Sequence, residues 1–324
     1  MSSSSGKPSL RAYDFAKVGG RWYLHVSIEG VFVSSSAFGS TIVSAISSDP
    51  IPQAASELYL DLMKKLLTRV IFARSIERHT IRATGPKSKL LWGLNRYTKR
   101  VNLEFVRLVP TSVSDYVESG REAQRRAEDA ETMLGIRQLD QMQRCMVDVL
   151  ENNVPGDILE AGVWRGGMTI FMRAVLKAYQ DVERKVWVVD SFEGLPPIDR
   201  EKDTFDWDEG NLAASLEEVQ SYFARYGLLD EQVCFLKGFF CDTLPDPRIS
   251  KLAILRVDAD LYTSTKEVLS ALYPALSVGG YAIFDDYQNL PDCRRAIDEF
   301  RQANGVTEEI HPIDQRAVYW KKLA

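Results

Sequence analysis

The sequence predicts an α/β protein with a doubly wound, mostly parallel sheet. The second half of the chain contains short runs that are apolar throughout, which is typical of strands covered by helices on both faces. Amphipathic segments separate these runs, so strands and helices alternate along the chain. The predicted strands are residues 157–162, 185–190, 232–237, 251–257 and 279–284.

The residues before these strands are expected to be mostly helical and to form a lid segment. Residues 57–73 carry apolar residues at spacings of three and four, which predicts an amphipathic helix. Ser114 is a candidate N-cap of a charged helix whose i,i+4 pairs favour solubility. A third helix is expected over residues 135–151, because Asn152-Asn153 and Pro155-Gly156 follow and end it.

Two hairpins are expected outside this core. Residues 21–28 and 31–33 flank Glu29-Gly30 near the N-terminus, and residues 309–313 and 317–320 form a similar pair at the C-terminus. The predicted organisation is a loosely ordered extension over 1–56, a helical lid or accessory segment over 57–134 and a ligand-binding domain over 135–324.

The composition is that of a soluble globular protein, and it excludes several kinds of partner. The 324 residues are 45% hydrophobic and 26% charged, with a net charge of −5, so no nucleic-acid partner is expected. No run of 18 apolar residues exists, so no membrane span is expected. The four cysteines lack metal-finger spacing and are interpreted as free thiols in a reducing compartment, which favours a cytoplasmic location.

The charge is unevenly distributed along the chain. Ten Lys and Arg residues lie between Arg69 and Arg107, whereas residues 190–218 are strongly acidic. A solvated basic surface, or one that docks on the acidic segment, explains this pattern, and an acidic or lipid partner is the alternative. Basic helices before the sheet are also compatible with a contact between identical subunits in a homo-oligomer.

A glycine turn after the first predicted strand indicates a nucleoside site. Residues 158–167 read ILEAGVWRGG, and the next strand ends at Asp190, where a carboxylate can accept hydrogen bonds from both ribose hydroxyls. A dinucleotide fingerprint needs glycine where Trp164 stands, and no P-loop is present, so NAD and nucleoside triphosphates are disfavoured. S-adenosylmethionine fits better, with Glu160 near its cationic methionine end, Asp190 at the ribose and residues 238–242 at the adenine. The alternative is that the glycines only allow tight strand-to-helix packing.

Three aspartates at the ends of two later strands indicate a metal site. Asp258 ends one strand and Asp285-Asp286 end the next, so their carboxylates are expected at the same edge of the sheet. Carboxylate oxygens suit Mg²⁺, which could lower the pKa of a substrate hydroxyl, and Asp258 or Asp260 could then act as the base. Taken singly, each aspartate could instead cap a helix.

Histidine is not expected to act as the base. The chain has only His25, His79 and His311, and none of them falls among the strand ends that carry the predicted site.

Residues 58–320 resemble the macrocin and mycinamicin sugar O-methyltransferase family. The resemblance is carried by LYLDLMKKLLTRVIF, ETMLGIRQLDQMQ, ILEAGVWRGGMTIFMRAVLKAY, VWVVDSFEGLPP, ARYGLLDEQVCFLKGFFCDTLP, LAILRVDADLYTSTKEVLSALYP and GGYAIFDDY. It implies a class I, Rossmann-like methyltransferase that uses S-adenosylmethionine and Mg²⁺ to methylate a hydroxyl of a glycosylated natural product. It also implies metal ligation by Asp258, Asp285 and Asp286, with Asp258 as catalytic base. The donor site that it implies consists of Thr132 and Met133 from the helical lead-in, Glu160, Gly162, Asp190, Ser191 and the segment around Asp242.

The chain departs from this family in three places, one of which is the region before Glu131, which is longer than usual. The family's Asp-Gly-Asp is Asp258-Ala259-Asp260 here, which we expect to be harmless. The acidic segment after Leu195-Pro196, which carries a histidine near the substrate in the family, is shortened to IDREKDTFDWDEGN, so the acceptor can differ from those of relatives.

The sequence therefore predicts a Mg²⁺-dependent O-methyltransferase with a small hydroxylated acceptor, a sugar or a related polyhydroxylated molecule. A phenolic or catechol-like acceptor is the alternative within this class, although the catalytic lysine of catechol methyltransferases is replaced by Leu261. A nicotinamide-dependent oxidoreductase and a non-catalytic nucleoside-binding module are the alternatives from other classes.

Overall fold

The computed structural model describes residues 13–18, 21–26, 53–72, 76–80, 106–110, 130–204 and 208–324. The chain divides into two compact units, formed by residues 1–49 with 76–109 and by residues 50–75 with 110–324. In the first unit, β1 (Tyr13–Val18) pairs antiparallel with β2 (Arg21–Val26). A second two-stranded sheet joins β3 (Ile76–Thr80) to β4 (Val106–Pro110).

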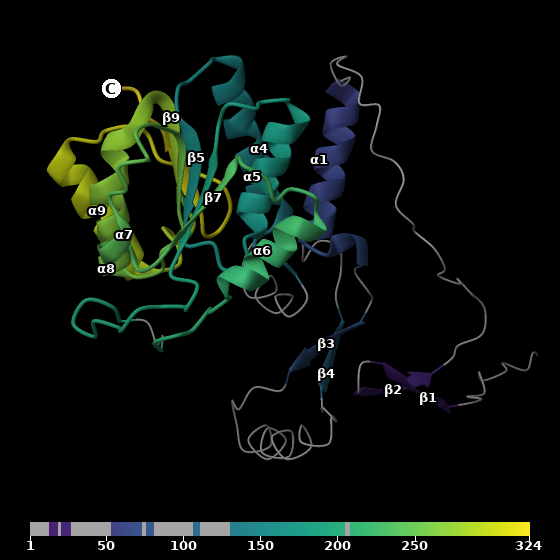
Figure 1. Ribbon diagram of the computed structural model, residues 1–324. Coiled ribbons are helices and arrows are strands. Elements are labelled where there is room, and N and C mark those ends of the chain that lie inside the picture. The colour runs from purple at the N-terminus through teal and green to yellow at the C-terminus, as the bar shows by residue number, and fades with distance from the viewer. Residues whose placement is uncertain are drawn as a thin grey trace, which may run out of the picture. The chain divides into compact units, whose positions relative to one another are not determined.

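A seven-stranded sheet forms the centre of the second unit, in the order β10-β11-β9-β8-β5-β6-β7 (Figure 1). Its strands are β5 (Asp157–Ala161), β6 (Val186–Asp190), β7 (Val233–Lys237), β8 (Leu252–Val257), β9 (Leu276–Phe284), β10 (His311–Pro312) and β11 (Val318–Lys321). β5 to β9 pair in parallel, and only β10 and β11 run antiparallel to their neighbours. The strand order reverses at β5, between β6 and β8, which is where open α/β sheets bind ligands.

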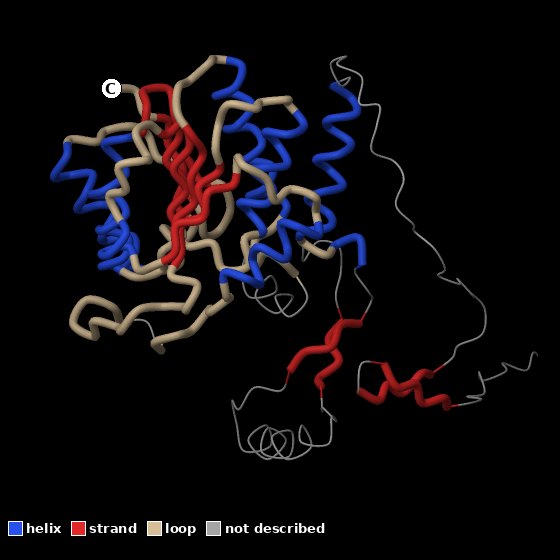
Figure 2. Tube along the Cα trace, in the orientation of Figure 1, coloured by secondary structure: helices blue, strands red, loops and turns tan. Residues whose placement is uncertain are grey.

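Helices cover both faces of this sheet, which Figure 2 shows in red between two blue layers. One layer contains α1 (Gln53–Leu67), α4 (Ile136–Glu151), α5 (Gly167–Ala178) and α6 (Leu216–Arg225). The other contains α7 (Phe240–Thr243), α8 (Tyr262–Leu272) and α9 (Pro291–Asn304). Short 3-10 turns, Val70–Phe72 and Tyr273–Ala275, follow α1 and α8.

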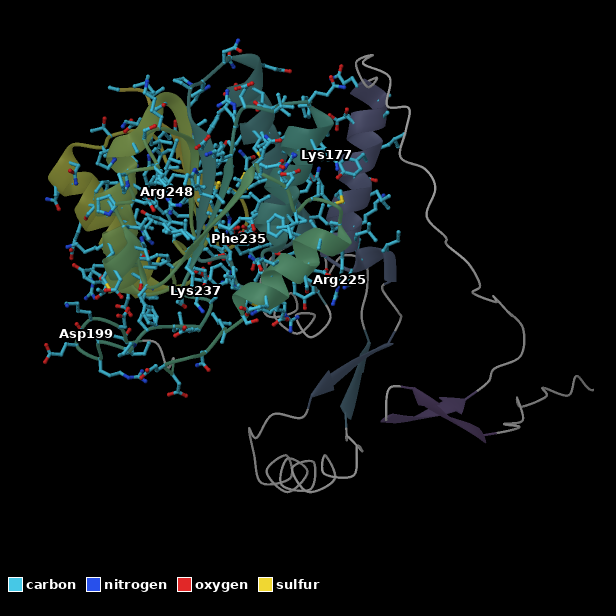
Figure 3. All side chains as sticks on the ribbon, in the orientation of Figure 1. Lys177, Asp199, Arg225, Phe235, Lys237 and Arg248 are labelled. Atoms are coloured by element: carbon cyan, nitrogen blue, oxygen red, sulfur yellow. The ribbon has the colours of Figure 1, made fainter. Side chains whose placement is uncertain are left out.

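Each layer encloses its own apolar core, because successive strand residues face opposite sides of the sheet. Ile158 of β5 belongs to the core under α4 and α5, and the adjacent Leu159 belongs to the core under α8 and α9. Phe235, labelled in Figure 3 on β7, meets Phe223 of α6 edge-on with ring centroids 5.6 Å apart. The continuous apolar runs of the sequence are thus explained by burial of the strands on both faces.

The predicted parallel sheet, with helices on both sides, is confirmed. All five predicted strands form within a few residues of their expected bounds, and the C-terminal hairpin forms and extends the sheet. The helix predicted over 57–73 instead starts at Gln53 and ends at Leu67, because Arg69 adopts a left-handed φ of 61° that a helix cannot continue through. Leu60, Met63 and Leu67 of this helix are buried in the core it shares with α5.

The N-terminal hairpin differs from the expected one. Arg21–Val26 is a strand, but its partner is Tyr13–Val18, and Gly19-Gly20 separate the two in the sequence. The expected partner, residues 31–33, and the helix expected after Ser114 lie outside the described residues. Among the described helices, none combines the length and the hydropathy that crossing a membrane would need.

Gly162 lies where the backbones of β5 and β8 meet at the end of the sheet. Its φ is +84°, and a Cβ at this position would lie 1.8 Å from the carbonyl oxygen of Asp258. The Asp258 N–H also donates a 2.8 Å hydrogen bond to the Ala161 carbonyl oxygen. Glycine is therefore required here both by its φ and by the absence of space.

We expect Gly162→Ala to destabilise the fold far more than Gly305→Ala does. Gly305 has a φ of +67° but no atom within 4 Å of an added Cβ, so its substitution measures the left-handed strain alone, about 1 kcal/mol. The clash with the Asp258 carbonyl adds to this strain at Gly162, and we expect a total loss above about 4 kcal/mol. Urea unfolding of both variants measures the difference, and equal losses would contradict the role of the close contact.

Candidate active site

A cavity of about 370 Å³ opens at the carboxyl ends of β5, β6 and β8. Its lining includes most of the residues that the sequence predicted for the site: Thr132, Met133, Glu160, Gly162, Asp190, Ser191, Asp258 and Asp285. Asp242 does not line it, whereas the adjacent Cys241 does, and Asp286 is buried and is not among the lining residues. Both halves of the predicted site, for the nucleoside and for the metal, therefore face one shared space.

Asp190 ends β6 and is held by the glycine turn. Its Oδ2 accepts hydrogen bonds from the backbone N–H groups of Val163 at 2.7 Å and Trp164 at 3.3 Å. Its Oδ1 accepts from the Phe192 N–H at 2.8 Å and from the Ser191 hydroxyl at 3.4 Å. Burial raises the pKa of Asp190, although these hydrogen bonds lower it. The two longest bonds, from Trp164 and Ser191, are the ones that ligand hydroxyls could replace most easily.

Thr132 and Met133 belong to an irregular segment with bends that precedes α4, since α4 begins only at Ile136. The Gly167 N–H donates a 3.0 Å hydrogen bond to the Glu131 carbonyl oxygen, and a Cβ on Gly167 would lie 2.4 Å from the same atom. The Thr132 hydroxyl accepts from the Leu134 N–H at 3.1 Å. This segment is thereby fixed over the N-terminus of α5, where it forms one wall of the cavity.

A buried arginine, Arg256 of β8, connects the two halves of the site. Its Nη1 donates to Glu160 Oε1 at 2.6 Å and to Asp258 Oδ2 at 2.8 Å, and its Nη2 donates to Asp285 Oδ1 at 2.9 Å. Nη2 also donates to Gln138 of α4 at 3.3 Å. Burial raises the pKa of Glu160 to about 7, while Arg256 acts to lower it. Within the described part of the chain, Glu160 Oε2 has no hydrogen-bond partner.

Carboxylate oxygens of Asp258, Asp260 and Asp286 lie within 4.8 Å of one another. Asp286 Oδ1 accepts hydrogen bonds from Arg316 Nη2 at 2.6 Å and Asn289 Nδ2 at 3.0 Å. Its Oδ2 is buried and, among the described residues, has no partner. Burial, followed by the charge of the neighbouring aspartates, raises the pKa values of Asp258 and Asp260 well above the usual range.

Asp285 lies beside this group and contacts two guanidinium groups. Arg256 donates to its Oδ1, and Arg316 Nη2 lies 3.5 Å from its Oδ2. When all are ionised, the five carboxylates of the site (Glu160, Asp258, Asp260, Asp285 and Asp286) exceed the two guanidinium groups by three negative charges. A divalent cation would offset most of this excess, so carboxylate donors and an unpaired buried oxygen both fit Mg²⁺.

The alternative that these aspartates only cap helices finds no support in the described residues. α8 follows Leu261 and α9 follows Leu290, and neither helix has a side-chain hydrogen bond from its N-cap residue. The first N–H of α8, at Tyr262, donates instead to Asp203 Oδ1 at 2.7 Å.

Asp203 belongs to the shortened acidic segment after β6, which the structure fixes to the helices beside it. The backbone N–H and hydroxyl of Thr204 donate to Asp292 Oδ2 at 2.7 and 2.8 Å, and Arg295 donates to the Lys202 carbonyl oxygen at 2.5 Å. Lys202 and Asp203 line the cavity, and Figure 3 shows the nearby Asp199 on the same loop, beyond the carboxyl end of the sheet. This segment therefore contributes a loop to the wall of the cavity.

Sequence reasoning did not find Arg256, Arg316, Gln138 or Asp203. Arg256 carried a usable signal, because a charge inside an otherwise apolar buried strand needs buried partners. The other three lie on segments without such a pattern. His311 is an exposed residue of β10 and is not among the residues that line the cavity.

The fold and the site define an O-methyltransferase. The solved structure of the O-methyltransferase NovP matches this chain with a TM-score of 0.63 and 38% identity, and covers 83% of this chain and 100% of that one. The predicted enzyme class is therefore confirmed.

The chain belongs to the macrocin O-methyltransferase (TylF) family, whose model matches residues 56–322. The mycinamicin III 3''-O-methyltransferase of Micromonospora griseorubida is 40% identical over 285 residues, which are 84% of this chain and 99% of that protein. The demethyldecarbamoylnovobiocin O-methyltransferase of Streptomyces niveus is 48% identical over 200 residues, which are 60% of this chain and 76% of that protein. Membership of this family implies S-adenosylmethionine as the methyl donor.

Proposed function

We propose that this enzyme is a Mg²⁺-dependent O-methyltransferase that moves the methyl group of S-adenosylmethionine to a hydroxyl of a sugar or glycosylated natural product. The observation that carries the proposal is one cavity with a nucleoside-type turn on one side and clustered carboxylates on the other. The names of two relatives, which act on mycinamicin III and on a demethyldecarbamoyl form of novobiocin, support an acceptor of this kind.

The donor is proposed to lie along the glycine turn. Glu160 would accept hydrogen bonds from the ammonium group of the methionine part, because its Oε2 is buried, unpaired among the described residues and at the cavity wall. Asp190 and Ser191 would bind the ribose hydroxyls, and Gly162 lines the cavity at the end of β5. Thr132, Met133 and the segment around Asp242 complete the proposed donor site, with Cys241 the residue of that segment that lines the cavity.

The metal is proposed to bind Asp258, Asp285 and Asp286, with Asp260 beside them. When bound there, Mg²⁺ supplies Lewis-acid chemistry: it orients an acceptor hydroxyl and lowers its pKa. Arg316 holds Asp286, and Arg256 holds Asp258 and Asp285, so these carboxylates keep their orientation before any ligand arrives.

The proposed methyl transfer needs a base and an in-line approach. Asp258, or alternatively Asp260, takes the proton of the acceptor hydroxyl, and the oxygen forms a bond to the methyl carbon. The carbon–sulfur bond breaks, and its electron pair stays on sulfur as S-adenosylhomocysteine leaves. Closeness of the base to the donor turn follows from the backbone contact between Gly162 and Asp258.

Metal binding can be tested on single carboxylates. We expect Asp286→Asn to weaken Mg²⁺ binding, measured by calorimetry, by at least about thirtyfold, or about 2 kcal/mol, since it removes the charge of an otherwise unpaired buried oxygen. Asp298→Asn on the outer face of α9, where the carboxylate accepts from Tyr287, is the matched control and should leave the affinity unchanged. Equal affinity of Asp286→Asn and wild type would refute the metal site.

A comparison of Asp285→Asn with Asp260→Asn tests which of these two aspartates binds the metal together with Asp258 and Asp286. We expect Asp285→Asn to weaken Mg²⁺ binding strongly, and Asp260→Asn to retain it. The opposite result would assign Asp260 as the ligand, in line with the short separation of its carboxylate from those of Asp258 and Asp286.

Donor binding by the metal-free protein should depend on pH through Glu160. Its pKa is raised to about 7, with Arg256, Asp285 and Asp190 as the charged groups that face it. The carboxylate is charged above this pH and neutral below it, so the affinity for S-adenosylhomocysteine should fall as the pH decreases through 7, by up to about tenfold per pH unit. Calorimetry between pH 8 and pH 6 measures this slope, and Glu160→Gln should remove most of it. A slope that persists in Glu160→Gln would assign it to another group, and tight NADH binding would reject the proposed function.

A further inference from the structure

Arg256 occupies a position that the proposed methyl transfer does not by itself explain. Its side chain is fully buried, and its guanidinium group lies between Glu160, on the proposed donor side, and Asp258 with Asp285, on the proposed metal side. The parallel register of β5 and β8 places Arg256 directly beside Glu160, so this contact is built into the sheet.

One nitrogen atom of this guanidinium group is shared between the two sides. Nη1 donates to Glu160 at 2.6 Å and to Asp258 at 2.8 Å, and the adjacent Nη2 donates to Asp285 at 2.9 Å. Charge-assisted hydrogen bonds of this length are strong, and a fully buried group cannot exchange them for bonds to water. A change in the charge of one carboxylate therefore changes how strongly the guanidinium group binds the other two.

We propose that Arg256 is a positioning residue that couples donor binding to metal binding, so that each ligand weakens the binding of the other. This inference rests on the proposed function, in which Glu160 meets the donor's ammonium group and Asp258 and Asp285 meet Mg²⁺. A cation at Glu160 weakens the Glu160–Arg256 pair and repels the guanidinium group, which then binds Asp258 and Asp285 more tightly. Those two carboxylates become poorer ligands for Mg²⁺, and by linkage Mg²⁺ weakens donor binding to the same extent.

The coupling can be tested in donor-free protein by removing the charge of Glu160. Glu160→Gln leaves the guanidinium group to Asp258 and Asp285, so we expect Mg²⁺ binding, measured by calorimetry, to weaken at least about tenfold, or about 1.4 kcal/mol. Asp190→Asn is the matched control: it removes another buried carboxylate on the donor side, whose hydrogen bonds come from backbone N–H groups and Ser191. Simple loss of negative charge should act similarly in both variants, so we expect the control to change the affinity less than about threefold.

A second comparison isolates Arg256 itself. Arg256→Lys keeps the positive charge, but an ammonium group lacks the planar fork that reaches both sides at once. In this background, adding Glu160→Gln should shift the Mg²⁺ affinity less than about threefold, which gives a coupling energy by double-mutant cycle. Thermal unfolding shows which variants are folded, and if Arg256→Lys is not, the comparison of Glu160→Gln with Asp190→Asn decides alone.

The outcomes separate this inference from the function on which it rests. Equal shifts in Glu160→Gln and Asp190→Asn, with Mg²⁺ bound by the wild type, would overturn the coupling and leave the proposed function intact. Absence of Mg²⁺ binding by the wild-type protein would reject the metal part of the proposed function, and the coupling with it. If the role of Arg256 is purely structural, Arg256→Lys should change the unfolding temperature. Glu160→Gln should then shift the Mg²⁺ affinity equally with arginine or lysine at position 256.

Discussion

The compensation of buried negative charge is the constraint on which the site depends. Five carboxylates meet at the ends of β5, β8 and β9, and three of them, Glu160, Asp285 and Asp286, are almost fully buried. Arg256 and Arg316 compensate part of this charge and hold the carboxylates in fixed orientations. Removing one partner of such a buried group leaves an uncompensated charge, which is strongly destabilising. A divalent cation and a sulfonium donor are ligands that this remaining negative charge favours.

Much of the fold could be predicted because burial on both faces produces a clear pattern. The apolar runs located all five parallel strands, and Asp258 and Asp285, which follow two of them, line one cavity at the edge of the sheet where they were expected. The partners of Arg256 depend on the register of β5 against β8 and on side-chain orientation, which hydrophobic periodicity does not specify. Arg316 reaches the site from the loop between β10 and β11, far away in the sequence. Cys241 lines the cavity and the adjacent Asp242 does not. Both belong to the short helix α7, and the sequence does not specify which of its residues faces the cavity.

The wall formed by the acidic segment is attached differently from the rest of the cavity. The donor and metal sides are built on strand ends and buried ion pairs, whereas Lys202 and Asp203 are held by hydrogen bonds to α8 and α9. Loops fixed in this way can change length and sequence without altering the sheet beneath them. Residues 198–211, where the sequence was expected to depart from the family pattern, thus belong to a structural element separate from the strands that carry the carboxylates.

The contact between Gly162 and the carbonyl group of Asp258 has a consequence for altering this enzyme. Because two main chains touch there, the spacing between the glycine bend and the first acidic residue is set by the scaffold and cannot be tuned by exchanging side chains. Grafting of surface loops should therefore leave the distance between the glycine turn and Asp258 unchanged. Redesign of β5 or β8 would move both sides of the cavity together.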